Sequence, residues 1–392
     1  MSLHFKGEIM DKKLFVNAHV ISPDLDLADG VVLVEDGKVA DILLPGEALP
    51  EDCERVDIQG DYLFPGFFDI HTHGCANFDF CDASVEGIQA IAANKLTQGV
   101  TSFLGTTLTL PEKQLAEAIT IARDYMKHPT GAKIPAIHLE GPFFTAECAG
   151  AQNPDYLKLP DIGLVKRMND IYPVCKVSYS IELDPEQTFV RELVSCGIMP
   201  AVAHSAATYE NFKRATAHGL KHMSHFCNVM TPLHHLNFGL VGGGMLHKDV
   251  FIEMICDGIH LCPEMIQLLF QVKGVDHIML ITDSMRAAGM PDGVYELGGL
   301  PATVKDGCAR LANGRVAGST LLYYKGLQRV RRLTELPLAQ LVKTTAWNQA
   351  RSLGIDGIGK IARGFNADFV RLDSTLEPVA TWTDGRRAWS RG

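Results

Sequence analysis

The apolar and polar positions of this chain follow one pattern at its two ends and another in its middle. Between residues 13 and 62, short β-rich stretches such as 31–34 and 39–43 alternate with tight turns, and residues 35–38 form a hairpin turn. Residues 360–370 and 381–386 return to the same short strands and turns. We therefore expect residues 1–62 and 366–392 to form one small β-sandwich domain.

The middle of the chain alternates apolar strands with helical segments. A helix is expected over 113–126, and strands are expected at 63–70, 101–106, 136–140, 177–181, 200–204, 221–225, 250–255 and 277–283. Alternating strands and helices over roughly 250 residues are typical of a (β/α)8 barrel. The sequence therefore predicts an α/β fold in which residues 63–365 form the barrel.

Residues that bind metals or move protons stand at the ends of these predicted strands. His71 and His73 lie two apart, so their side chains project the same way from one strand. In such barrels the functional groups come from the carboxyl ends of the strands. The residues found there are His71, His73, Glu140, His204, His225, His260 and Asp283.

These residue types suit a metal-dependent hydrolase. Imidazole and carboxylate groups bind zinc, iron, manganese or cobalt, and Glu140 can bind one cation or bridge two. Asp283 is either a further ligand or the group that takes a proton from an activated water. His260 lies just beyond its strand and is interpreted as a substrate contact. His235 belongs to an adjacent histidine pair whose side chains diverge, which favours a substrate-loop or solvent role.

Composition narrows the class of protein. The chain has 392 residues, of which 46% are hydrophobic, enough for a large core and a second small domain. A net charge of −10 with interspersed signs argues against a nucleic-acid partner. No apolar run approaches the ~20 residues of a membrane span, and the N-terminus lacks the apolar segment of a signal peptide. Ten cysteines without CxxC spacing indicate reduced thiols in a cytoplasmic protein.

Several segments resemble the amidohydrolase superfamily and, within it, the N-acetylglucosamine-6-phosphate deacetylase family. Residues 65–74, Pro-Gly-Phe-Phe-Asp-Ile-His-Thr-His-Gly, resemble the opening barrel strand of the superfamily. The Leu-Glu-Gly-Pro element at 139–142 and the Asp-Gly-Ile-His element at 257–260 are specific to the deacetylases. The resemblance also includes residues 203–205, 224–230, 282–287, 318–320 and 364–368, and so spans nearly the whole chain.

The resemblance implies a role for each site residue. Glu140, His204 and His225 would hold the main divalent metal ion, and His71 and His73 would hold a second that shares Glu140. Asp283 would be the general base and acid in hydrolysis of an N-acetyl amino-sugar 6-phosphate to acetate and the free amine. The substrate would contact Gln152, Asn228, the backbone of Val229, and His260. The resemblance also implies a homodimer.

One loop departs from the family pattern. The family usually reads His-His-Arg-Glu-Pro-Gly, and its arginine reaches the substrate phosphate across the dimer interface. Here residues 234–239 read His-His-Leu-Asn-Phe-Gly, which puts Leu236 in the arginine position. Leucine offers no charged fork to a phosphate. An amidohydrolase that deacylates an unphosphorylated or different N-acyl sugar is therefore the alternative.

Overall fold

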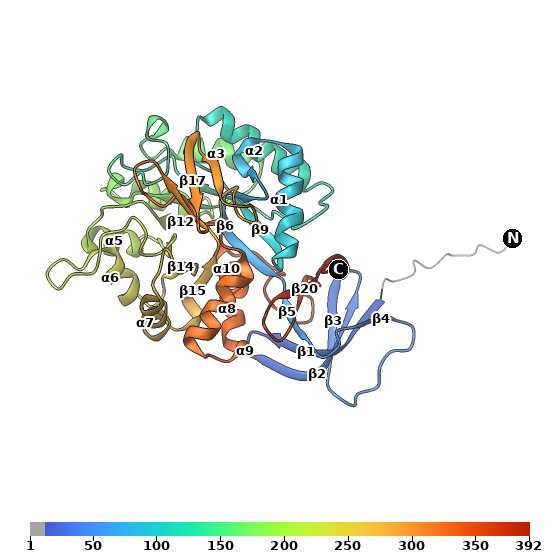
Figure 1. Cartoon of the computed structure of the whole chain (residues 1–392). Coiled ribbons are helices and arrows are strands. Elements are labelled where there is room, and N and C mark those ends of the chain that lie inside the picture. Colours follow the sequence, from blue (N-terminus) through green and yellow to red (C-terminus); the bar gives the residue numbers. More distant parts are fainter. Residues whose placement is uncertain (1–11) are drawn as a thin grey trace.

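The structure, a computed structural model, describes residues 12–392 and divides into a barrel and a small β domain (Figure 1). The blue N-terminal strands and the red C-terminal strands of Figure 1 lie in the same small domain. Both the parallel barrel and the sheet domain built from the two ends of the chain are as the sequence predicts. Within residues 12–392, no helix combines the length and apolar character that a membrane crossing requires.

The small domain is one sheet in the order β21-β20-β19-β5-β1-β2-β3, with β4 also paired to β1. The strands β4 and β5 run parallel to β1, and the other ladders of this sheet are antiparallel. An apolar cluster that includes Phe15, Phe369 and Trp382 forms its core. The strands are β1 (Lys12–Ser22), β2 (Leu25–Glu35), β3 (Lys38–Leu43), β4 (Glu54–Asp57), β5 (Tyr62–Pro65), β19 (Phe369–Leu372), β20 (Pro378–Thr383) and β21 (Arg386–Ser390).

The barrel consists of eight parallel strands in chain order. They are β6 (Phe67–Thr72), β9 (Val100–Thr106), β10 (Ile137–Glu140), β11 (Val174–Tyr179), β12 (Met199–Val202), β13 (His222–Met223), β14 (Phe251–Ile255) and β15 (Ile278–Ile281). The helix α2 buries an apolar face that includes Leu115, Ala118 and Ala122, spaced three and four apart. The helices are α1 (Val85–Thr97), α2 (Glu112–Tyr125), α3 (Ile162–Ile171), α4 (Thr188–Ser195), α5 (Tyr209–Ala217), α6 (Gly239–Leu246), α7 (Pro263–Lys273), α8 (Tyr323–Thr334), α9 (Leu338–Leu341) and α10 (Trp347–Leu353).

The single strand expected over residues 63–70 is two strands that meet at Gly66. Residues of β5 pair with β1 and β19 in the small sheet, whereas β6 pairs with β9 in the barrel. A side chain at position 66 would collide with Thr101, so glycine allows the chain to pass closely from one sheet to the other. The small sheet therefore continues to Pro65, beyond the predicted boundary at residue 62.

Side chains close the barrel between its first and last strands. The carboxylate of Asp69 accepts hydrogen bonds from Thr282 (Oγ1, 2.6 Å) and from the buried ammonium of Lys95 (2.8 Å). The backbone N–H of Asp283 donates to the carbonyl of His71 at 2.8 Å. This seam holds two of the predicted site residues at a fixed distance from each other.

A three-stranded antiparallel sheet follows the last barrel strand and was not expected from the sequence. Its strands are β16 (Gly293–Leu297), β17 (Leu300–Lys305) and β18 (Cys308–Leu311). The turns between them are Gly298-Gly299 and Asp306-Gly307, which are hairpin signals. Figure 1 shows β17 on the far side of the barrel from β1, β2 and β3. A two-strand hairpin, β7 (Gly74–Cys75) and β8 (Phe78–Asp79), follows β6 directly.

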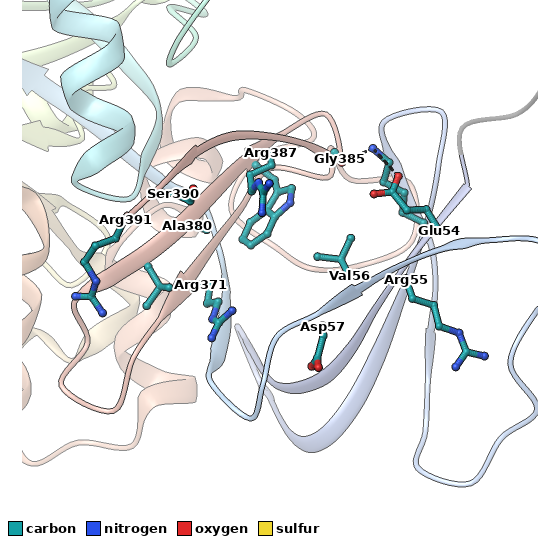
Figure 2. A pocket seen from close by; sticks show the side chains of 13 residues that line it. Glu54, Arg55, Val56, Asp57, Arg371, Ala380, Gly385, Arg387, Ser390 and Arg391 are labelled. Carbon is teal, nitrogen blue, oxygen red and sulfur yellow. Dashed lines mark hydrogen bonds and ion pairs between the residues drawn. The ribbon is translucent and has the colours of Figure 1, made fainter.

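The small domain carries a basic groove of about 480 Å³. Arg55, Arg371 and Arg387 line it (Figure 2). Trp382 is also part of the lining. The Arg371 guanidinium is already paired with Asp61 at 2.6 Å. All the lining residues come from the terminal β segments, so the groove is separate from the polar residues at the barrel strand ends.

Candidate active site

Three of the predicted site residues lie two positions past the end of a barrel strand and share an unusual backbone conformation. His204 follows β12, His225 follows β13 and Asp283 follows β15. Their φ angles are 46°, 30° and 48°, in the left-handed region of backbone conformation that residues other than glycine rarely adopt. Such conformations cost about 1–3 kcal/mol each and concentrate at functional sites. They place these side chains at the mouth of the barrel.

Glu140, the last residue of β10, is the centre of one cluster. Its Oε1 atom lies 3.0 Å from His225 Nε2 and 3.5 Å from His204 Nε2. The two imidazole Nε2 atoms are 3.2 Å apart. All three side chains are buried, so the atoms converge on one point that is shielded from solvent.

A second cluster shares the same carboxylate. His71 Nε2 lies 3.3 Å from Glu140 Oε1, and His73 Nε2 lies 3.2 Å from Glu140 Oε2. Asp283 Oδ1 faces both imidazoles, at 3.5 Å from His71 and 3.4 Å from His73. The structure thus brings together the five predicted metal ligands and Asp283.

The donor atoms fit a divalent cation in each cluster. In both, three possible ligand atoms lie within 4.8 Å of one another. His71 Nδ1 is 2.8 Å from Glu253, and His204 Nδ1 is 2.9 Å from the carbonyl of Cys148. Each Nδ1 therefore carries the proton and leaves the Nε2 lone pair for a metal. His71 Nε2 is buried without a hydrogen bond, as expected of a ligand atom.

The electrostatic environment of the site favours the ionised form of its two carboxyl groups, Glu140 and Asp283. Burial disfavours charge on Glu140, but the surrounding imidazoles, His71 first, hold the pKa of this carboxyl well below its usual range. Burial likewise opposes charge on His71, yet Glu140 and Asp283 raise the pKa of this imidazole to about 9. The pKa of Asp283 is lowered because the nearby histidines outweigh its burial. A bound cation replaces the imidazole protons, since ligating histidines must be neutral.

Two buried charges inside the barrel were missed by the sequence analysis. Glu253 on β14 is ion-paired with Lys176 on β11, and both are fully buried. The same carboxylate accepts from His71 and from the backbone N–H of His225 (3.3 Å). The signal available in the sequence was Glu253 itself, a single charged residue inside the otherwise apolar strand predicted at 250–255. His138, by contrast, bonds Ser178 at 2.7 Å and belongs to neither cluster.

A cavity of about 270 Å³ opens beside the two clusters. Gln152, Asn228 and Val229, which the resemblance assigns to the substrate, all line it. The amide of Gln152 also donates to Glu140 Oε2 at 2.7 Å and accepts from the backbone N–H of Thr109 at 2.7 Å. Gln152 therefore fixes the shared carboxylate as well as facing the cavity.

The other predicted substrate contacts lie off the cavity wall. The His260 ring is hydrogen-bonded to Asp257 at 2.7 Å, and that carboxylate raises the pKa of His260 against the effect of burial. His235 lies in an exposed loop and does not diverge from His234 as the sequence predicted: the ring centres are 4.2 Å apart and the ring planes are tilted by 43°. Leu236 in the same loop is 77% exposed. Within the free chain, none of these three side chains lines the cavity.

Comparison with known proteins identifies related enzymes. The sequence pattern of the amidohydrolase family matches residues 62–388. The chain is 34% identical to N-acetylglucosamine-6-phosphate deacetylase of Lysinibacillus sphaericus, over 91% of this chain and 92% of the relative. It is 32% identical to N-acetylgalactosamine-6-phosphate deacetylase of Escherichia coli O157:H7, over 92% and 95% of the two chains.

Comparison with solved structures gives relatives of the same kind. The N-acetylglucosamine-6-phosphate deacetylase of Thermotoga maritima superposes with a TM-score of 0.87 at 33% identity, covering 96% of this chain and 100% of that one. The Mycobacterium smegmatis enzyme in complex with N-acetyl-D-glucosamine-6-phosphate superposes with a TM-score of 0.90 at 29% identity, covering 97% and 100%.

Proposed function

This chain belongs to the amidohydrolase family, and we propose that it is a metal-dependent deacetylase of an N-acetyl amino-sugar 6-phosphate. The substrate proposed is N-acetylglucosamine-6-phosphate, and the products are glucosamine-6-phosphate and acetate. One observation carries the proposal: the Asp283 carboxylate lies against two clusters of possible metal ligands that share Glu140, beside a cavity. Sequence relatives named for this reaction support the choice of substrate.

Glu140, His204 and His225 would hold the main cation, and His71 and His73 would hold a second one. When bound, a divalent cation supplies Lewis acidity that polarises the amide carbonyl and makes water a better nucleophile. Zinc, iron, manganese and cobalt all suit these ligands. We further propose a cytoplasmic homodimer.

Asp283 moves the proton. Its lowered pKa keeps the carboxylate ionised near neutral pH, so it can accept a proton as water attacks the acetyl carbon. Asp283 then gives this proton to the amide nitrogen while the C–N bond breaks. Water and amide are thereby converted to acetic acid and amine, with Asp283 returned to its starting form, and the acid then gives its proton to the amine to leave acetate and an ammonium group.

The alternative substrate is an unphosphorylated or differently acylated sugar. It is favoured by Leu236, which stands where a phosphate-binding arginine is expected and lies off the cavity wall. A comparison of acetate release from N-acetylglucosamine and N-acetylgalactosamine, each with and without the 6-phosphate, separates the two proposals. The assay uses protein reconstituted with zinc, iron, manganese or cobalt.

We expect kcat/KM to be at least about tenfold higher for a 6-phosphate than for the matching free sugar. Equal values would favour the alternative substrate. No acetate release from any of the four sugars with any of the four metals would refute the deacetylase proposal.

A further inference from the structure

We propose that Arg315 binds the anionic group of the substrate and makes this enzyme selective for phosphorylated sugars. This inference rests on the proposed function, because it assigns the phosphate of that substrate to a residue. Among the residues that the structure describes, Arg315 is the only arginine or lysine on the wall of the 270 Å³ cavity. It belongs to the turn between the three-stranded sheet and the segment that follows it.

The guanidinium lies against the substrate-facing wall. Its Nη1 atom is 3.4 Å from the carbonyl of Gly150. A Cβ atom at Gly150 would in turn be 2.8 Å from the His204 ring and 3.5 Å from Val229. Arg315 is thus separated from a metal ligand and from a predicted substrate contact by one backbone segment.

Arg315 has donors to spare. The contact with Gly150 is long and uses one N–H, whereas a guanidinium offers five in a planar fork. Its side chain is exposed, so it retains access to a ligand that enters from solvent. An anion that enters the cavity can therefore receive two parallel hydrogen bonds from Arg315.

The backbone beneath Arg315 is well anchored. Its N–H donates to Asn313 Oδ1 at 3.0 Å, and its carbonyl accepts from Leu311 N at 2.9 Å. Four residues later, Ser319 N donates to the carbonyl of Asp283 at 2.7 Å. Residues 315–319 therefore connect the proposed anion site at Arg315 to the backbone of Asp283. The residue proposed to bind the phosphate and the residue proposed to act at the amide are thus joined by one short segment.

Binding of a phosphate group here needs a positively charged side chain, because the other ionisable side chains on the cavity wall are carboxylates or proposed metal ligands. Glu147 lines the same wall, and Glu140 and Asp283 lie deeper. A sugar phosphate would be repelled by these carboxylates in the absence of metal and Arg315. Lys248, the next basic residue in the chain after the loop at 234–239 apart from histidine, donates to the carbonyl of Val272 instead.

The test compares Arg315→Leu and Arg315→Lys with wild type in steady-state assays. Arg310→Leu is the matched control, because Arg310 is exposed on β18, bonds Gly314 O at 2.8 Å, and is not on the cavity wall. Each variant is assayed with N-acetylglucosamine-6-phosphate and with N-acetylglucosamine. Inorganic phosphate and glucosamine-6-phosphate are tested as inhibitors, and their binding is measured by calorimetry.

For Arg315→Leu we expect KM for the phosphorylated substrate to rise about tenfold to hundredfold, the loss of one charge-assisted contact. The value of kcat should change by less than about threefold, and KM for the free sugar should stay the same. Arg315→Lys should fall between wild type and Arg315→Leu, since lysine keeps the charge without the fork. Arg310→Leu should behave as wild type with both substrates.

An unchanged KM for the phosphorylated substrate in Arg315→Leu, or an equal rise for both substrates, would overturn the role of Arg315. Failure of the proposed function gives a different result, because wild type itself would then release no acetate. In that event, the calorimetric affinity for glucosamine-6-phosphate in wild type and Arg315→Leu still decides whether Arg315 binds the anion.

Discussion

Glu253 provides a sharp test of how the barrel interior supports the metal site. The substitution Glu253→Gln keeps the size of the side chain and removes its charge. One oxygen of the carboxylate, Oε2, accepts from His71 Nδ1 at 2.8 Å and from the backbone N–H of His225 at 3.3 Å, and the other, Oε1, pairs with Lys176. A glutamine has one oxygen, so it can place an acceptor at only one of these two positions.

Either orientation of the glutamine has a cost. If its oxygen faces Lys176, its NH2 group faces His71 Nδ1 and favours the tautomer with the proton on Nε2, which cannot bind a metal. If its oxygen faces His71, its NH2 group faces the buried ammonium of Lys176, which then loses its hydrogen-bond acceptor as well as the ion partner that it loses in either orientation. Loss of a residue that orients a metal ligand typically weakens metal binding about 10- to 100-fold. Leaving a buried charge unpaired typically costs about 3–5 kcal/mol of stability.

The assay has two readouts. Metal content is measured by elemental analysis after equilibration in buffers of graded free zinc, and stability is measured by urea denaturation. The double variant Lys176→Met/Glu253→Gln separates the effects: it should regain part of the lost stability but keep the weakened metal binding, because His71 still lacks its carboxylate. Wild-type zinc affinity in both variants would refute the claim that Glu253 orients His71.

Four other substitutions test the site and its surroundings. Asp283→Asn should retain metal and lower kcat by about 10²- to 10⁴-fold, and near-normal kcat would contradict its role in proton transfer. His225→Ala should lower metal content more than His73→Ala if the cluster around His225 holds the main ion; the reverse order in elemental analysis would assign the main ion to His71 and His73. Burial, reinforced by Lys176 and opposed by Glu253, lowers the pKa of His222 from its ordinary value of 6.5 to about 3. As pH falls from 6.5 toward 3, His222 therefore binds a proton in the unfolded chain but stays neutral in the folded chain. The free energy of unfolding consequently falls by up to about 1.4 kcal/mol per pH unit in that window. His222→Leu should make this slope shallower in urea titrations between pH 6.5 and 5, and an unchanged slope would show that His222 does not titrate on unfolding.

The sequence was sufficient to predict which candidate metal ligands gather at the rim of the barrel, because two simple regularities apply to them. Side chains alternate along a strand, and parallel barrel strands end at the same rim. His71, Glu140 and His204 are far apart in the chain, yet each stands at a predicted strand end, so their meeting followed from the fold class alone. In the structure, Glu140 Oε1 lies 3.3 Å from His71 Nε2 and 3.5 Å from His204 Nε2.

Other parts of the site were decided by tertiary structure. The ion pair of Lys176 with Glu253 joins two strands that are not neighbours in the sheet, and no local pattern encodes which strands face each other across the barrel. Gln152 reaches Glu140, and Arg315 reaches the cavity, from loops whose paths depend on packing. The sequence by itself determined which residues stand at the rim, because strand periodicity is local. Only the folded chain decided which side chains support or surround them, because those contacts depend on the closure of the barrel and the placement of its loops.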